Sequence, residues 1–175
     1  MKKLPGARTD PVHSFRWETP PDPNRGLKGE YFHDRHHNGN KKVLERIDPV
    51  VDFEWATESP LPGKIEPREF AIRWTGSVLA PETGEYEFVV RSDHAFRFWV
   101  NDQQHPLIDG GVRSGKDTEF VAPIFLLGGR SYAIKLEFMK AEQGVNDSKN
   151  NPNRPSLPAM THLEWKRPGG VRETI

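Results

Sequence analysis

The stretch FAIRWTGSVLAPETGEYEFVVRSDHAFRFWVNDQ, residues 70–103, indicates the fold of this chain. Apolar side chains occupy alternate positions over 70–75, as in a strand with one buried face. The Pro-Glu-Thr-Gly segment at 81–84 predicts a turn, and residues 85–91 alternate in the same way as the first segment. A third strand, rich in aromatic residues, is predicted at 96–100. Strands joined by short polar connections in this way indicate an antiparallel sheet.

Short extended segments separated by Gly and Pro make up the rest of the chain. Alternation is clearest over 132–139, while residues 43–51 fit either a helical turn or a strand. No segment sustains the period of about 3.6 residues that marks a helix. We therefore predict an all-β fold, an antiparallel two-sheet β-sandwich with long loops at one end. The further predicted strands are 27–32, 52–55, 106–109, 120–127 and 162–166.

The chain divides into three predicted parts. A Pro-rich leader spans 1–26, where the prolines exclude a helix and the alternation at 13–17 fits an edge strand as well as a linker. The β-sandwich domain spans 27–170 and ends at a Pro-Gly-Gly turn signal. Residues 171–175 are interpreted as a tail that is truncated from a larger protein.

Charge and composition exclude several classes of function. The 25 basic residues balance the 25 acidic ones, whereas a nucleic-acid-binding protein usually carries a basic excess. With no Cys, the chain forms neither disulfides nor Cys-ligated metal sites, and no apolar run reaches membrane-spanning length. Motifs for a serine nucleophile or a phosphate-binding glycine loop are absent from the sequence. We therefore expect no nucleic-acid partner, no membrane insertion and no catalysis.

From Gly26 to Gly170 the chain resembles the protective-antigen (PA-fourteen) domain. This β-sandwich occurs in anthrax protective antigen, in yeast flocculins and epithelial adhesins, and in bacterial glycosidases and surface proteins. The resemblance implies the same fold for this chain. It is carried by GLKGEYF at 26–32, RWTG at 73–76, the hairpin at 84–101, LGGRSY at 127–132 and LEW at 163–165.

The resemblance also implies a ligand site. In the lectin-like members of the family, two adjacent Asp residues after the central strand bind calcium across a cis peptide. A loop before the last strand supplies an Asn and further ligands, and the ion then binds neighbouring hydroxyls of a sugar. Calcium takes about six to eight oxygen ligands, and a sugar diol can supply two of them. The implied calcium ligands in this chain are Asp93, Asn146, Asp147 and Asn150.

This chain departs from the family pattern at His94, which stands where a second Asp is expected. Imidazole is a poor calcium ligand because calcium prefers hard oxygen atoms. The alternative interpretation of Asp93-His94 is a turn that joins two strands. The loop at 140–156 is likewise open to two interpretations, a ligand-binding loop or a solvated insertion.

Three further patterns have both a functional and a structural interpretation. Trp99 lies opposite the main apolar face of its predicted strand and either stacks on a sugar or packs within the protein. His36 and His37 suggest a metal site, but adjacent side chains on an extended chain diverge, which favours a solvated loop. Glu85 and Glu87 share one strand face, so cross-strand salt bridges explain them better than a glycosidase acid pair does.

We predict a non-catalytic carbohydrate-binding module of a larger extracellular or cell-envelope protein, acting as a monomer. Its partners are expected to be a cell-wall or extracellular polysaccharide and the neighbouring domains of the parent protein. The alternative is a structural or protein-interaction domain that binds neither sugar nor metal, which His94 favours. The residues that we expect to contact a ligand are Asp93, His94, Trp99, Asn146 and Asp147.

Overall fold

The computed structural model describes residues 25–112, 116–141 and 156–175. The edge strand expected at 13–17 lies outside these residues. Apart from one short 3-10 helix, η1 (Gly39–Lys41), the regular elements of the described part are strands. They are β1 (Leu27–Phe32), β2 (Lys42–Asp48), β3 (Asp52–Ala56), β4 (Glu69–Ala80), β5 (Gly84–Ser92), β6 (Ala95–Val100), β7 (Ile108–Asp109), β8 (Glu119–Leu126), β9 (Arg130–Ala141), β10 (Ala159–Lys166) and β11 (Arg172–Thr174).

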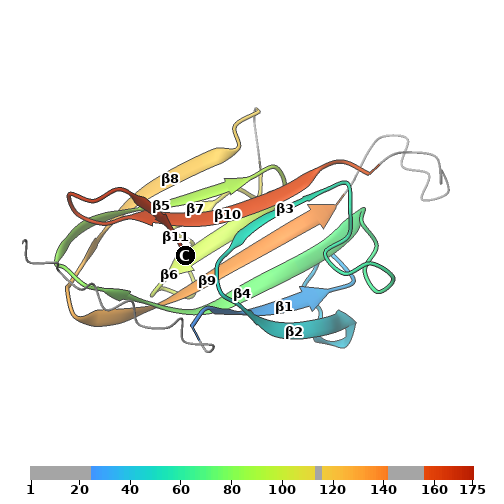
Figure 1. The fold of residues 1–175 in the computed structure, drawn as a ribbon, viewed down its shortest axis with the longest axis horizontal. Helices are drawn as coiled ribbons and strands as arrows, with labels where there is room; N and C mark the ends of the chain where they lie inside the picture. Colours follow the sequence, from blue (N-terminus) through green and yellow to red (C-terminus); the bar gives the residue numbers. More distant parts are fainter. Residues whose placement is uncertain (1–24, 113–115, 142–155) are drawn as a thin grey trace, which may run out of the picture.

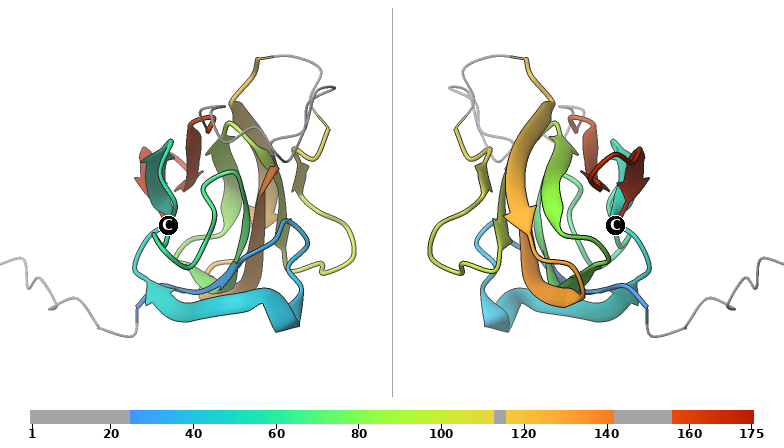
Figure 2. Two further views of the ribbon diagram at one scale, coloured as in Figure 1. Left: turned by 90° about the vertical axis from the view of Figure 1, so that its right-hand side faces the viewer. Right: turned by 90° about the vertical axis from the view of Figure 1, so that its left-hand side faces the viewer.

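These strands form two antiparallel sheets that pack face to face (Figure 1). The six-stranded sheet has the order β2-β1-β4-β9-β6-β7. The second sheet has the order β11-β10-β5-β8, and β3 pairs with β10 beside β11. Figure 2 views the sandwich from its two ends. The predicted all-β, two-sheet sandwich is confirmed. None of the described residues belongs to a helix long and apolar enough to cross a membrane.

The alternating residues of the opening stretch form the core between the sheets. On β4, Phe70, Ile72 and Trp74 are fully buried, and Ile72 lies opposite Phe138 of β9. On β5 the buried face includes Phe88, whose ring contacts the ring of Phe98 across the sandwich at 5.2 Å between centroids. Period-two alternation thus becomes two facing apolar layers, as in other β-sandwiches.

Of the two interpretations of residues 43–51, a helical turn or a strand, the structure supports the strand, because β2 pairs with β1 along its length, from Asp48 opposite Leu27 onward. The tail expected at 171–175 is instead part of the domain. Gly169, at φ +64°, turns the chain back, and β11 pairs with β10. The Ile175 N–H donates to the Leu163 carbonyl of β10, and the Ile175 carbonyl accepts the Val51 N–H. The described domain therefore continues past the expected boundary at 170 to the last residue.

A buried polar cluster joins β2 to the centre of the six-stranded sheet. The Asp48 carboxylate accepts hydrogen bonds from the Tyr31 hydroxyl at 2.7 Å and the Trp74 indole at 2.8 Å. Arg46 donates to the same carboxylate at 2.6 Å. Burial and the neighbouring Asp48 raise the pKa of Tyr31 well above its ordinary value. A side chain at Gly29 would collide with the Asp48 carboxylate, so this position requires glycine.

Candidate functional site

The predicted site residues Asp93 and His94 form the connection between the two sheets. They follow β5 of one sheet and precede β6 of the other. The Ser92 hydroxyl closes this short turn, since it donates to the His94 carbonyl at 3.0 Å and accepts from the His94 N–H at 3.3 Å. The described residues contain no cis peptide bond, so Asp93 and His94 are joined by a trans bond. The turn interpretation therefore describes the backbone here.

Both side chains of this turn contact the segment that enters β10. The Asp93 carboxylate accepts the backbone N–H of Met160 at 2.8 Å, and His94 Nε2 donates to the carbonyl oxygen of Pro158 at 2.8 Å. In Figure 1, β9 runs toward the right-hand end of the sandwich and β10 starts from there. We call this end, with residues 92–94 and 156–160, the loop end. The structure thus places the turn at Asp93 and His94 beside the described segment that enters β10.

Trp99 is not brought to the loop end. It lies near the far end of β6, on the outer face of the six-stranded sheet, and is 7% exposed. The Lys135 ammonium covers its ring at 3.9 Å from the centroid. A ring covered in this way offers no open platform to a sugar, and the cation–π contact explains its burial. The packing interpretation of Trp99 therefore fits the structure, and the sugar-stacking one does not.

The described part of the loop end supplies few calcium ligands. Asn146, Asp147 and Asn150 lie outside the described residues. Within the described ranges, no group of three or more His, Cys, Asp or Glu side chains could hold a metal ion. One oxygen of Asp93 already accepts a backbone N–H, and the adjacent side chain is an imidazole. Of the four calcium ligands that the family resemblance implies, the structure therefore describes only Asp93, whereas a calcium site needs about six to eight oxygens.

Lys140 belongs to the loop end and was not identified from the sequence. Its side chain is fully buried, and its ammonium donates to the Ser156 hydroxyl at 2.8 Å and to the Leu157 carbonyl at 2.5 Å. The alternation of β9 carried the signal: Lys140 continues the inward face of Leu136 and Phe138. A lysine at an inward position of a strand is unusual, because a buried charge needs hydrogen-bonding partners.

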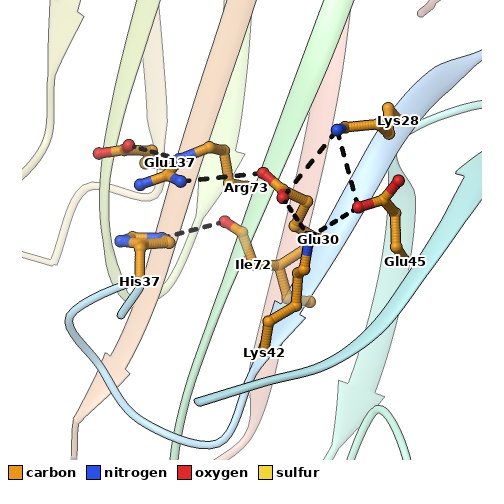
Figure 3. Close-up of polar contacts among 8 residues, drawn as sticks. All are labelled: Lys28, Glu30, His37, Lys42, Glu45, Ile72, Arg73 and Glu137. Atoms are coloured by element: carbon orange, nitrogen blue, oxygen red, sulfur yellow. Dashed lines mark hydrogen bonds and ion pairs between the residues drawn. The ribbon is translucent and has the colours of Figure 1, made fainter. Parts of the chain in front are cut away.

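The histidine pair of the first loop has a structural role. His36 bonds within its own turn, where its N–H donates to Asp34 at 3.1 Å. His37 instead folds onto the outer face of the six-stranded sheet, where Nε2 donates to the Ile72 carbonyl at 3.3 Å (Figure 3). Its ring packs edge-on against Phe32 and is only 9% exposed. The predicted solvated loop is thus wrong for His37, because this ring covers an apolar part of the sheet.

Burial determines the protonation of His37. Loss of contact with water lowers the pKa of the His37 imidazole below its ordinary value. The nearby Glu137 carboxylate opposes this pKa shift, and the Arg73 guanidinium adds to it. The neutral ring is therefore the form that the folded protein favours.

Charges on the same outer face are paired across the strands. Arg73 lies between Glu137, at 2.9 Å, and Glu30, at 3.8 Å, and Lys42 bridges Glu30 and Glu45 at 2.9 and 2.7 Å (Figure 3). Glu45, Glu30, Arg73 and Glu137 lie opposite one another on successive antiparallel strands, as cross-strand pairs do, whereas Lys42 and Glu45 are both on β2. Lys28 lies 3.7 Å from Glu45, so three basic and three acidic side chains form this cluster.

Glu87 of β5 also has a cross-strand partner. Its carboxylate lies 3.7 Å from the ammonium of Lys166 on β10, so the salt-bridge interpretation of this residue is confirmed.

The opposite end of the sandwich holds a groove of about 980 Å³. The two sheets are open to each other there, and the groove reaches Leu27 and Val78 of one sheet and Trp165 of the other. Exposed Val50 and Leu79 lie on its rim. We call it the apolar groove.

Comparison with known families gives one match over most of the chain. A family model described as "PA14 domain" matches residues 23–175. The anti-sigma-I factor RsgI3 of Acetivibrio thermocellus is 33% identical over 113 residues, which is 65% of this chain. The chain spans only 17% of the length of that relative.

Solved structures share the fold. An anti-sigma factor domain-containing protein matches with a TM-score of 0.70 and 28% identity, over 86% of this chain and 46% of its own. The epithelial adhesin 9 A domain of Candida glabrata, solved in complex with Galβ1-4GlcNAc, has a TM-score of 0.61. The match covers 90% of this chain and 88% of the adhesin, and the 10% identity shows similarity of fold alone.

Proposed function

We propose that this chain, which belongs to the PA14 domain family, is a non-catalytic carbohydrate-binding module. The sugar is expected to bind at the loop end. One observation carries this proposal. Asp93 and His94 are hydrogen-bonded to the segment that enters β10, so two loops from different parts of the chain form one polar surface. A surface assembled from loops on a rigid sandwich is a common setting for ligand binding.

Asp93 is the residue that we expect to contact the sugar. Its side chain is half-buried, and one carboxylate oxygen accepts the Met160 N–H. The other oxygen has no partner among the described residues and remains available to a sugar hydroxyl. Hydrogen bonds to a carboxylate are roughly twice as strong as those between neutral groups. We propose a direct contact from Asp93 to the sugar, because the neighbouring side chain is the imidazole of His94, a poor calcium ligand.

The relatives suggest the setting in which such a module works. This chain resembles part of larger proteins that are named as anti-sigma factors, and an adhesin of the same fold holds a galactose-containing disaccharide. We propose that the module is part of a larger regulatory protein and binds an extracellular or cell-envelope carbohydrate. The neighbouring domains of that protein would then be its other partners.

Glycan binding is tested on the whole chain. A glycan array selects candidate sugars, and calorimetric titration measures them with calcium and with a chelator. We expect binding in both conditions and at least about tenfold weaker binding for Asp93→Asn, because the amide keeps an acceptor for Met160 but loses the charge. Asp109→Asn is the matched control, an exposed carboxylate on β7 whose partner is Arg97 at 3.1 Å. No binding at millimolar sugar in either condition would exclude the proposal.

A protein-interaction domain is the second candidate, and the apolar groove favours it. Its lining is mainly apolar, and it lies at the end away from the polar loops. Leu79→Asp would place a charge on the rim of this groove. If the groove docks a neighbouring domain of the parent protein, this variant should weaken their association by at least about tenfold in sedimentation experiments. An unchanged association would exclude the groove as the docking surface.

A further inference from the structure

We propose that the loop end is organised by the buried ammonium of Lys140 rather than by a bound calcium ion. Lys140 is a positioning residue: it contacts the loop ends and not the sugar. The sugar-binding part of this inference rests on the proposed function, whereas the structural part does not require it.

The first argument is burial together with partners. Lys140 has no exposed surface, so its charge cannot reach water by extending along the protein surface. Its ammonium donates to the Ser156 hydroxyl at 2.8 Å and to the Leu157 carbonyl at 2.5 Å, and it lies 5.9 Å from the centre of the Phe70 ring. Two oxygen acceptors and an aromatic face are suitable partners for a buried ammonium.

The second argument is the place of these contacts along the chain. Lys140 is the next-to-last residue of β9, and the acceptors Ser156 and Leu157 come just before β10. Its hydrogen bonds therefore join the two ends of the connection between these strands. A contact that closes a loop offsets part of the entropy lost when the loop ends are brought together.

The third argument is that the remaining contacts of this segment come from the predicted site. His94 holds Pro158 and Asp93 holds Met160, while Lys140 holds the residues just before them. The Ser156 hydroxyl also donates to the Pro67 carbonyl at 3.1 Å. This hydrogen bond connects the segment before β10 to the loop before β4. Residues 156–160 are thus held at successive points by side chains and backbone of three other segments.

These groups differ from the ligands of a calcium ion. Among the described residues, Lys140 donates to a hydroxyl and a carbonyl, and the carboxylate of Asp93 accepts a backbone N–H. Calcium prefers several carboxylates within a shell of about six to eight oxygens. In the described part of the loop end, we therefore infer that the Lys140 ammonium takes the organising role that a bound calcium ion would otherwise have.

The test compares Lys140→Met with Lys135→Met. Both lysines are on β9, but Lys135 lies over Trp99 on the outer face, so its replacement is a matched control. Hydrogen exchange of the Leu157, Ala159 and Met160 amides is measured with calcium and with a chelator. In the unchanged protein we expect chelation to alter exchange less than about twofold, whereas Lys140→Met should accelerate it at least about tenfold.

Local exchange separates positioning from general destabilisation. At a temperature where the variant is folded, amides of β4 near Val78 should keep their protection in Lys140→Met, because they lie at the other end of the sandwich. If Lys140→Met does not fold, Ser156→Ala removes one acceptor and the contact to Pro67 and should accelerate the same amides. Chelation that accelerates exchange as much as Lys140→Met does, or unchanged exchange in the lysine and serine variants, would overturn the proposal.

Sugar affinity is a second readout. If the proposed function holds, Lys140→Met should bind sugar at least about tenfold more weakly while Lys135→Met binds normally. If the unchanged protein binds no sugar, the exchange experiment still decides the role of Lys140. The positioning role of Lys140 and the sugar-binding function can therefore be refuted independently of each other.

Discussion

The two ends of the sandwich are completed in different ways. At the loop end, Lys140, Asp93 and His94 hold residues 156–160 through hydrogen bonds, above a cluster of packed aromatic rings. At the other end the sheets remain open around an apolar groove. The loop end can therefore present polar groups in fixed positions, which suits a sugar. The open end presents apolar surface, which suits a protein partner.

The largest expected effect tests the packing below the loop end. Phe138 contacts Phe70, Trp55 and His94 at ring-centroid distances of 5.7, 5.5 and 6.1 Å, and it is fully buried. Phe138→Ala should lower the free energy of unfolding by about 3–5 kcal/mol, because it removes a large buried side chain and leaves a cavity. Urea unfolding measures this value. A loss below about 1 kcal/mol would show that the loop end is as loosely packed as the groove end.

The next effect concerns the polar cluster that joins β2 to the sheet, where Asp48 lies opposite Leu27 of the groove. Asp48→Ala should lower the free energy of unfolding by about 2–4 kcal/mol, because the Tyr31 hydroxyl and the Trp74 indole lose their acceptor. It should also lower the pKa of Tyr31, because Asp48 contributes to raising it. Urea unfolding and an absorbance titration check the two effects. An unfolding free energy equal to that of Asp109→Asn would contradict the first.

A smaller effect is the pH dependence that His37 adds on the outer face. The pKa of His37 is lowered in the folded state, so the unfolded chain binds the proton more readily. Stability should therefore fall as pH drops below the unfolded value of about 6.5, with a slope of at most about 1.4 kcal/mol per pH unit from this residue. His37→Gln, which can still donate to Ile72, should remove that part of the slope. Unfolding curves between pH 7.5 and pH 5 would contradict the assignment if both proteins had the same slope.

The smallest effect is expected at the groove. Leu79 is 59% exposed on its rim. Leu79→Ser should change the free energy of unfolding by less than about 0.5 kcal/mol in the isolated chain, because little buried surface is lost. A loss near that of Phe138→Ala would mean that the groove end is closed in solution. The contrast between the ends would then disappear.

Much of the fold was predictable because β-alternation is a local property of the sequence. The apolar positions of β4, β5 and β9 predicted which side chains face the core, and the structure confirms them. The tail at 171–175 was misjudged because β11 is short and depends on pairing with β10. His37 was misjudged for a similar reason, since the sheet that buries it comes from distant segments.

The sequence by itself determined most of the strands, the all-β class and the position of the turn at Asp93 and His94. Those features follow from alternation and turn residues within a few positions of one another. Only the tertiary structure decided which segments meet. Lys140 lies inward by the alternation of its strand, but its acceptors come from beyond the following loop. Contacts between residues far apart in the chain depend on strand order and register, and no local pattern records them.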